Sequence, residues 1–308
     1  MTPPAFPSRR ALLGGLGAAA LASPALVRPG LAQSPAQSAA PSPAWTYEAF
    51  QEAMQKSGRN ARIGAQQFAA IQARKPAAMR RIERYLTERL GAADPAVMAA
   101  FHALPREYFH YLYSANASTA TDAYEEVPKP WGLGYGSALS DYLGQAYMTQ
   151  ICEAKPDHTV LEIGTGSGFQ IALLSRMVKA AYSIEIIEPL GHAVSPIFAP
   201  LGYDNVQTRV GDGYFGWPEV GNAPGGGFDV IIVTCAAQYA PPELFKQMKP
   251  GGRMIIPIGQ PFKRGQVLYV YSKDAEGKIH SRRDMGVFFI PMTGAMMQQR
   301  PPGRPSAT

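Results

Sequence analysis

The residues most able to do chemistry lie in one short stretch, Val160-Leu-Glu-Ile-Gly-Thr-Gly-Ser-Gly-Phe169. Its first four residues are apolar apart from Glu162 and predict a short buried strand. The strand runs into three alternating glycines: Gly164, Gly166 and Gly168. A helix is predicted next, over 170–178. A strand, a glycine turn and a helix open a βαβ unit, in which a nucleoside ligand binds at the carboxyl end of the strand.

The spacing of these glycines argues against a dinucleotide. The dinucleotide fingerprint would place its third glycine at position 169, which is Phe169. Alternating glycines with an acid inside the strand suit a ligand without a pyrophosphate, such as S-adenosyl-L-methionine. A second acid should then end the next strand, about 20 residues on, and bind the ribose hydroxyls. Glu185, in a predicted strand over 180–187, lies 21 positions after Gly164. The alternative is a structural turn in an unrelated α/β protein.

Two further polar residues stand beside predicted elements. Asp212 follows a predicted strand over 206–210, where a carboxylate can accept a hydrogen bond from an adenine amino group; a plain turn aspartate is the alternative. Ser140 precedes a predicted helix over 141–153, and its pattern alone predicts that it caps this helix.

Composition and charge exclude several other classes of site. The 308 residues are 46% hydrophobic, enough for one large domain or for one domain with an appendage. Cys152 and Cys235 lack the spacing of a disulfide framework or a zinc cluster, and we expect buried free thiols. The five histidines are scattered, so we expect no metal site. No basic stripe with interleaved aromatic residues predicts a nucleic-acid partner.

Residues 1–32 are typical of a twin-arginine export signal. Arg9-Arg10 precedes a run rich in Ala, Gly and Leu, with small residues before possible cleavage points after Ala25 or Ala32. The run is too short and too weakly apolar for a spanning helix of about 20 residues. We therefore expect a periplasmic protein without stable membrane association after cleavage; a cytoplasmic location is the alternative. Cleavage after residue 32 removes three arginines and no acids, which lowers the formal charge from +6 to +3.

The rest of the chain divides by pattern into four regions. Residues 33–44 predict a flexible linker, 45–145 a helical N-terminal region with a lid, 146–294 an α/β domain and 295–308 a disordered tail. The α/β domain is expected to be Rossmann-like, a mostly parallel twisted sheet with helices on both faces.

Particular elements are also predicted within these regions. Met79, Ile82, Leu86 and Leu90 recur at helical spacing before Gly91. Asp94-Pro95 should begin another helix, with Asp94 as its N-cap. The segment 111–135 is predicted to be an ordered loop that covers the site. The remaining expected elements are strands over 228–234, 254–258, 267–271 and 287–290 and a helix over 244–249.

Several stretches, taken in chain order, together resemble the protein-L-isoaspartate O-methyltransferase family. They are Ala103-Leu-Pro-Arg-Glu-x-Phe109, Gly134-x-Gly-x-x-x-Ser140, the stretch 160–169, Ser183-Ile-Glu-Ile-Ile-Glu-Pro189, Leu201-Gly-Tyr-x-Asn-Val206, Gly211-Asp-Gly-Tyr-x-Gly-Trp-Pro218 and Lys249-Pro-Gly-Gly-Arg253. The resemblance implies a class I methyltransferase fold that binds S-adenosyl-L-methionine. It also implies esterification of the side-branch carboxylate of isoaspartyl residues in damaged proteins, after which the ester closes to a succinimide that hydrolyses partly to aspartate.

The resemblance also assigns roles to residues. It implies that Gly164, Thr165, Gly166 and Gly168 line the methionine end of the cofactor, with Glu162 beneath them. Glu185 would bind the ribose, Asp212 with Gly213 the adenine edge, and Ser140 would be the active-site serine beside the accepting carboxylate. That carboxylate is already a nucleophile at neutral pH, so no catalytic base is required. The expected partners are isoaspartyl peptides and proteins, bound by a monomer.

The chain departs from the family pattern in two places. The family usually has Gly-Gln-Thr-x-Ser where this chain has Gly136-Ser-Ala-Leu-Ser140, so Ala138 replaces a threonine. The segment before Pro105 is also longer than in compact members. Two alternatives to the isoaspartyl hypothesis therefore remain. One is an exported carboxyl methyltransferase for another peptide or small acid, and the other is a non-catalytic binding protein with the same fold.

Overall fold

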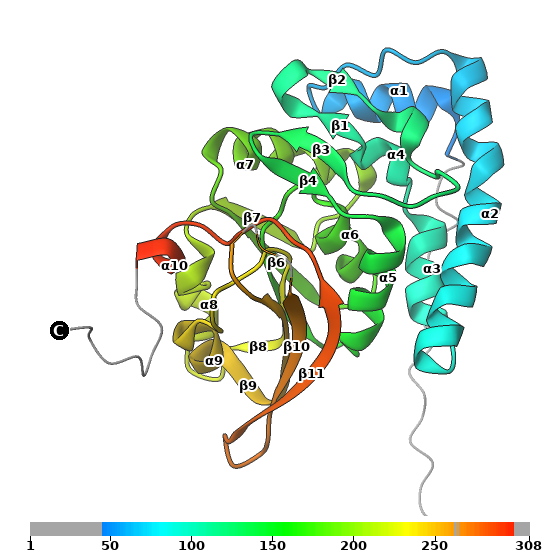
Figure 1. Cartoon of the computed structure of the whole chain (residues 1–308). Helices are drawn as coiled ribbons and strands as arrows, with labels where there is room; N and C mark the ends of the chain where they lie inside the picture. Colours follow the sequence, from blue (N-terminus) through cyan, green and yellow to red (C-terminus); the bar gives the residue numbers. More distant parts are fainter. Residues whose placement is uncertain (1–44, 262, 264, 299–308) are drawn as a thin grey trace, which may run out of the picture. The chain divides into compact units, whose positions relative to one another are not determined.

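The computed structural model of the chain describes residues 45–261, 263 and 265–298. The predicted export signal and linker, 1–44, and the end of the chain, 299–308, lie outside the described residues. A seven-stranded sheet carries helices on both of its faces (Figure 1). This confirms the predicted α/β fold.

The sheet is parallel over five strands and antiparallel at one edge. Its order is β11-β10-β9-β8-β5-β6-β7, and β5 to β9 are parallel while β10 and β11 are antiparallel. The strands are β5 (Thr159–Ile163), β6 (Ala180–Glu185), β7 (Val206–Val210), β8 (Phe228–Val233), β9 (Met248–Ile258), β10 (Gln266–Lys273) and β11 (Ile279–Val287). The chain winds outward from β5 to β7 and then returns to β8 on the other side of β5. The carboxyl end of β5 is therefore the switch point at which such sheets bind ligands.

Each face of the sheet packs into its own hydrophobic core. Val160 of β5 belongs to one core, and Leu161 and Ile163 belong to the other. This alternation follows from the period of two in a strand. Glu162 is fully buried and lies on the same side as Val160. A buried acid in such a strand needs a reason other than packing.

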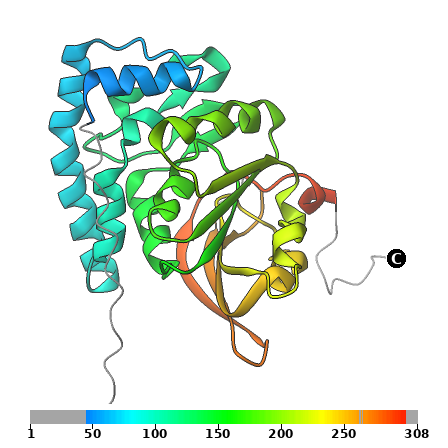
Figure 2. The same ribbon diagram turned by 180° about the vertical axis from the view of Figure 1, so that it is seen from behind.

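The larger core joins one face of the sheet to the N-terminal helices. The helices before the sheet are α1 (Tyr47–Lys56), α2 (Ala65–Leu90), α3 (Pro95–Ala103), α4 (Arg106–Phe109) and α5 (Tyr142–Ile151). Those after β5 are α6 (Phe169–Ser175), α7 (Glu188–Val194), α8 (Pro218–Gly221), α9 (Pro242–Gln247) and α10 (Ala295–Gln298). Phe50 of α1, Ile82 of α2 and Leu173 of α6 share one core, and Figure 2 shows α1 and α2 flanking the sheet region.

The helix signals in the N-terminal region are confirmed except at one position. Met79, Ile82 and Leu86 are buried, whereas Leu90 is 37% exposed in the last turn of α2. Gly91 ends α2 in the left-handed conformation at φ 87°. The Asp94 carboxylate accepts the Ala96 N–H at 2.7 Å and caps α3.

Some predicted boundaries were wrong. Asp141, not Ser140, caps α5, because its carboxylate accepts the N–H groups of Leu143 and Gly144. The segment 111–135 holds short elements: β1 (Tyr111–Leu112), β2 (Ala117–Ser118), β3 (Trp131–Gly134) and the 3₁₀ turns Tyr113–Ala115 and Ala120–Asp122. The strand β3 pairs with β4 (Ser137–Leu139).

The C-terminal predictions also need correction. The last strand is Ile279–Val287 and not 287–290. An edge strand is half solvated, so β11 lacks the apolar run that was used as the signal. The first residues of the predicted disordered tail form α10, whose Met296 is fully buried.

Candidate active site

Two cavities meet at the carboxyl ends of β5, β6 and β8. The larger, of about 500 Å³, is lined by Ser140, Glu162 and Thr165 among others. The smaller, of about 220 Å³, is lined by Glu185, Asp212 and Gly213 among others. The residues common to both cavities are Ala138, Gly164, Gly166 and Thr234. The two cavities therefore adjoin at the glycine turn.

The glycine turn has the shape of a cradle for a ligand. Gly164 has φ 98°, and a Cβ there would lie 2.7 Å from the Thr234 hydroxyl oxygen. The Gly164 N–H donates to the Ile184 carbonyl at 2.8 Å, and the Thr234 hydroxyl donates to the Gly164 carbonyl at 2.7 Å. Gly166, at φ 54°, lines both cavities, and a Cβ there would meet Leu133 at 3.6 Å, an ordinary van der Waals contact. Hydrogen bonds therefore hold the backbone of the turn, and its glycines have positive φ values and line the cavities without side chains, which suits a nucleoside ligand.

Two of the residues predicted to bind the cofactor differ from the others: Gly168 is turned away from the cavities, and the Thr165 hydroxyl already has a hydrogen-bond partner. Gly168 lines neither of these cavities, and a Cβ there would lie 2.8 Å from the Phe198 ring. Thr165 is only 4% exposed, and its hydroxyl oxygen lies 2.7 Å from the Ser183 hydroxyl oxygen. Thr165 therefore faces the cavity mainly through its backbone.

Glu162 is the buried acid at the floor of the larger cavity. Its Oε2 accepts the Ser183 hydroxyl at 2.5 Å, while its Oε1 has no partner among the described residues. Burial raises the pKa of Glu162 well above its usual value, and the nearby Glu185 raises it further. A buried carboxyl without a cation nearby is a ready binding partner for the ammonium group of an amino-acid ligand.

Glu185 ends β6 at the wall of the smaller cavity, as predicted. Its Oε2 accepts the Gly166 N–H at 2.8 Å and its Oε1 accepts the Ile187 N–H at 3.0 Å. Burial raises its pKa, and these backbone bonds oppose that rise. Each carboxylate oxygen keeps a lone pair for a further donor, such as a ribose hydroxyl.

Asp212 also lines the smaller cavity. Its Oδ1 accepts the Tyr214 N–H at 2.9 Å, and its Oδ2 accepts the Ala295 N–H at 2.7 Å. Gly294 precedes Ala295 at φ 70°, and a Cβ there would lie 2.3 Å from Asp212 Oδ2. The start of α10 is therefore tied to the predicted adenine residue.

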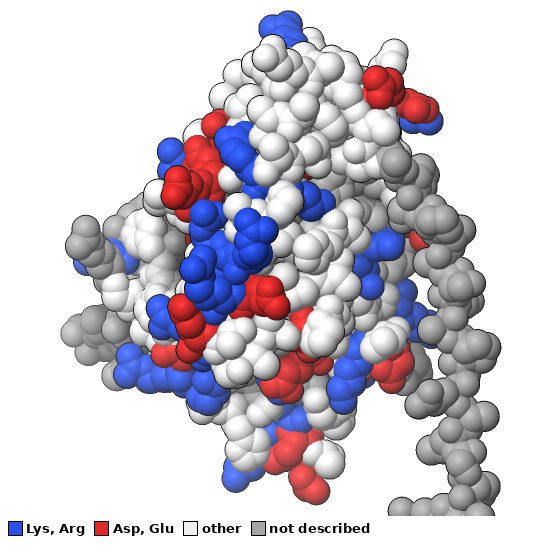
Figure 3. Space-filling view, turned by 90° about the vertical axis from the view of Figure 1, so that its right-hand side faces the viewer, with Lys and Arg blue, Asp and Glu red and all other residues white. Residues whose placement is uncertain are grey.

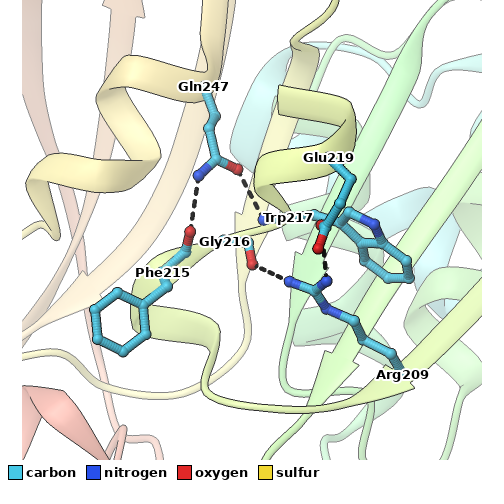
Figure 4. Close-up of polar contacts among 6 residues, drawn as sticks. All are labelled: Arg209, Phe215, Gly216, Trp217, Glu219 and Gln247. Carbon is cyan, nitrogen blue, oxygen red and sulfur yellow. Dashed lines mark hydrogen bonds and ion pairs between the residues drawn. The ribbon is translucent and has the colours of Figure 1, made fainter. Parts of the chain in front are cut away.

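A polar cluster behind Asp212 fixes the loop that carries it. Figure 4 shows Gln247 directed at this loop: it accepts the Trp217 N–H and donates to the Phe215 carbonyl, both at 2.8 Å. On the other side, Arg209 donates to the Gly216 carbonyl at 2.6 Å and to Glu219 at 2.9 Å. Gln247 is 1% exposed, so its bonds are shielded from water. The loop has little freedom to move away from the cavity.

Ser140 lies at the wall of the larger cavity and is held through its backbone. The Arg106 Nη2 donates to the Ser140 carbonyl at 2.7 Å, and Nη1 donates to Gln145 Oε1. Arg106 is 2% exposed and its guanidinium lies 4.8 Å from the centre of the Phe169 ring. Burial lowers its pKa to about 10, so it remains a cation at neutral pH.

Sequence reasoning missed several residues of the site. Arg106 was part of the resemblance without a role, and Gln145 and Thr234 were not singled out. The position of Thr234, directly after β8, was a usable signal, because strand ends of a parallel sheet meet at one edge. The contributions of Pro128, Tyr135 and 290–293 to the walls had no such signal.

Other features of the described residues add no second site. Among them, no cluster of three or more His, Cys, Asp or Glu side chains has the arrangement of a metal site. Within the same ranges, no helix has both the length and the apolar character needed to cross a bilayer. Cys152 and Cys235 are free, but only Cys152 is buried as expected, whereas Cys235 is partly buried. Burial raises the pKa of Cys152 to about 12. On the face in Figure 3, lysines and arginines lie among aspartates and glutamates.

Comparisons with known proteins agree on one family. The family model described as protein-L-isoaspartate(D-aspartate) O-methyltransferase matches residues 80–297. A protein-L-isoaspartate O-methyltransferase 2 of Syntrophobacter fumaroxidans is 45% identical over 213 residues, 68% of this chain and 81% of its own length. A protein-L-isoaspartate O-methyltransferase 1 of Nitrosospira multiformis is 48% identical over 172 residues, 56% of this chain and 70% of its own length.

A solved structure agrees as well. A protein-L-isoaspartate O-methyltransferase structure superimposes with a TM-score of 0.61 at 26% identity, covering 72% of this chain and 67% of that one. The N-terminal residues 45–79 described here precede the range of the family match.

Proposed function

Because the chain belongs to the protein-L-isoaspartate(D-aspartate) O-methyltransferase family, we propose that the two joined cavities are its active site. The protein is an S-adenosyl-L-methionine-dependent enzyme that methylates the carboxylate of L-isoaspartyl residues and so takes part in protein repair. The observation that carries the site assignment is the junction of the cavities at Gly164 and Gly166. A cofactor in one compartment and an acceptor in the other would meet there.

The smaller cavity would hold the adenosine part of the cofactor. Glu185 would accept the ribose hydroxyls through its remaining lone pairs, and Asp212 with Gly213 would border the adenine. The cofactor supplies an electrophilic methyl group on a sulfonium. Glu162, which lines the larger cavity, would bind the ammonium group, because its buried Oε1 has no hydrogen-bond partner in the part of the chain that the structure describes.

The larger cavity would hold the accepting carboxylate. Ser140 would donate one hydrogen bond to this carboxylate and orient it, because the nucleophile is already ionised at neutral pH. Alignment of the reacting atoms at about 3 Å is then the main contribution of the site. Pro128, Pro130 and Phe288 line the cavity and would exclude water, which otherwise solvates both charges that cancel in the reaction.

The test is methanol release from two matched peptides. We expect an isoaspartyl peptide to be methylated and the same peptide with normal aspartate to be refused. The isoaspartyl carboxylate is one methylene nearer the chain, and a displacement of about 1 Å can cost on the order of 100-fold in rate. Ser140→Ala should lower turnover without weakening cofactor binding.

The outcome also separates the two rival activities. Equal methylation of both peptides would favour a carboxyl methyltransferase with another substrate. Methylation of neither, with cofactor binding intact, would favour a non-catalytic binding protein.

We also propose that the protein acts in the periplasm as a monomer, after twin-arginine export, without stable membrane association and without a nucleic-acid partner. The support is Arg9-Arg10 before an apolar run, both outside the described residues. Replacing both arginines with lysine keeps the charge but removes the motif, so fractionation should find the unprocessed protein in the cytoplasm. A processed, exported double variant would contradict this proposal and favour the cytoplasmic alternative.

A further inference from the structure

The function described above gives no part to Gln145, a polar side chain of the larger cavity. Gln145 is 5% exposed and lines the cavity together with Ser140. Its backbone is fixed within α5, since its N–H donates to the Asp141 carbonyl at 3.1 Å. A buried glutamine side chain that borders a substrate cavity invites the question of which end faces inward.

The neighbours of Gln145 decide the direction of its amide. The Arg106 guanidinium has donors only, so the group that faces it must be the oxygen Oε1. The Nε2 group then points away from Arg106, and it has no hydrogen-bond partner among the described residues. This nitrogen is not fully enclosed, unlike several other unpaired side-chain atoms of these residues, so it is open to the cavity. The amide therefore presents a donor and not an acceptor.

Gln170, on the same wall, is oriented the opposite way. The Thr149 hydroxyl donates its one hydrogen to the backbone carbonyl of Gln145 at 2.7 Å. The same hydroxyl oxygen accepts a hydrogen bond from the Gln170 Nε2 group at 2.8 Å. The oxygen of Gln170 is thus left for the cavity. The wall offers one amide donor and one amide oxygen, each with a direction set by its neighbours.

Gln145 and Ser140 are also linked by one cation. Arg106 uses Nη1 for the Gln145 side chain and Nη2 for the Ser140 backbone. Two neighbouring nitrogens of a planar guanidinium hold both residues, and both residues line the larger cavity. A carboxylate has two oxygens, and Ser140 can serve only one of them with its single hydrogen.

We propose that Gln145 is a specificity-determining residue, whose Nε2 group donates a hydrogen bond to the second oxygen of the accepting carboxylate. Arg106 acts as the positioning residue that sets the direction of this donor and of Ser140. The inference rests on the proposed function. It also accounts for catalysis without the threonine that Ala138 replaces, because a second donor reaches the acceptor from α5.

Two substitutions separate this role from a merely structural one. Gln145→Glu keeps an oxygen for Arg106 but turns a carboxylate oxygen toward the acceptor. Gln145→Met removes both the oxygen and the donor. A residue that only anchors Arg106 would tolerate Gln145→Glu and suffer from Gln145→Met. A residue that donates to the acceptor should suffer more from Gln145→Glu, since two like charges would then face each other.

We expect kcat/KM for the isoaspartyl peptide to fall at least about 100-fold in Gln145→Glu and about 10-fold in Gln145→Met. Calorimetry with S-adenosyl-L-homocysteine should find affinities within about twofold of the unaltered protein. Gln145 does not line the smaller cavity, which would hold the adenosine, and it makes no hydrogen bond with Glu162, which would bind the ammonium group. Gln66→Glu, at an exposed position of α2, makes the same charge change and should leave kcat/KM unchanged.

The possible contrary results are distinct. Gln145→Glu activity near that of the unaltered protein, or above that of Gln145→Met, would overturn the inference alone. If Gln145→Glu fails to fold, Gln145→Met with undiminished kcat/KM would overturn it. An unaltered protein that binds S-adenosyl-L-homocysteine but methylates no isoaspartyl peptide would overturn the proposed function and this inference with it.

Discussion

The two cavities are built by different means. In the smaller cavity, the carboxylates of Glu185 and Asp212 are held by backbone N–H groups. In the larger cavity, Ser140 and Gln145 are held by the side chain of Arg106, which is 34 and 39 positions away in the sequence. A site held by backbone groups tolerates many changes in its neighbours. A site held by one buried side chain depends on that residue.

The largest expected effect comes from removing the link in the larger cavity. Arg106→Met leaves the Ser140 carbonyl and Gln145 Oε1 unpaired in a buried place, so the free energy of unfolding should fall by about 3 kcal/mol. Urea denaturation measures this loss. Arg80→Met, at an exposed position of α2, is the control and should change stability by less than about 0.5 kcal/mol. A loss below about 1 kcal/mol in Arg106→Met would show that the guanidinium is replaceable.

The next effect tests the smaller cavity. Glu185→Ala removes a charged acceptor for two ribose hydroxyls and should weaken S-adenosyl-L-methionine binding by about 2 kcal/mol, roughly 30-fold. Isothermal calorimetry gives the affinity. Glu188→Ala removes an exposed acid at the start of α7 and serves as the matched control. Unchanged affinity in a folded Glu185→Ala protein would refute the assignment of this cavity to the nucleoside.

A smaller effect with a definite pH dependence is expected at Glu162. Burial raises its pKa in the folded protein, so the unfolded chain releases this proton at lower pH and folding loses stability as pH rises between the two values. Glu162→Gln removes this loss and should raise the melting temperature of the cofactor-free protein at pH 8 more than at pH 5.

The same change should weaken cofactor binding. A neutral amide cannot pair with the ammonium group as a carboxylate does, so the affinity should fall by about 1.5 kcal/mol. Thermal unfolding at the two pH values and calorimetry check both halves. A variant that is stabilised equally at both pH values would mean that Glu162 keeps an ordinary pKa.

The smallest effect sharpens the comparison at the border between the cavities. Ala138 lines both of them, and Ala138→Thr adds a hydroxyl of the kind that the family usually has there. We expect the ratio of isoaspartyl to aspartyl methylation to rise by a few-fold, about 1 kcal/mol, because one more donor fixes the acceptor. Competition between the two peptides, followed by mass spectrometry, measures the ratio. A lower ratio would indicate that the added methyl group obstructs the junction.

The same contrast explains which parts of the site could be predicted. Glu162, Gly164 and Glu185 lie in or directly after strands whose apolar patterns are clear, and parallel strands bring their carboxyl ends to one edge. Their proximity follows from the order of elements alone. Gly168 lay in the same pattern, yet it packs against Phe198, because a helix start turns successive residues in different directions.

The C-terminal segment could not be predicted in this way. Residues 295–298 are short and weakly patterned, and nothing local indicates that the Ala295 N–H meets Asp212, 83 positions earlier. The predicted position of the edge strand β11 was wrong for a related reason, because half-solvated strands carry little apolar signal.

The sequence by itself determined the α/β fold, the nucleoside turn and the acids beside it, because spacing and strand periodicity dictate them locally. Only the tertiary structure decided that Asp141 caps α5 in place of Ser140, and that Arg106 joins Ser140 to Gln145. The Asp141 cap is local, and the sequence pattern leaves it undecided because both Ser and Asp are good N-cap residues. The link through Arg106 depends on the packing of α4 against α5 and α6. A single buried guanidinium has several possible partners in a sequence, and packing alone selects among them.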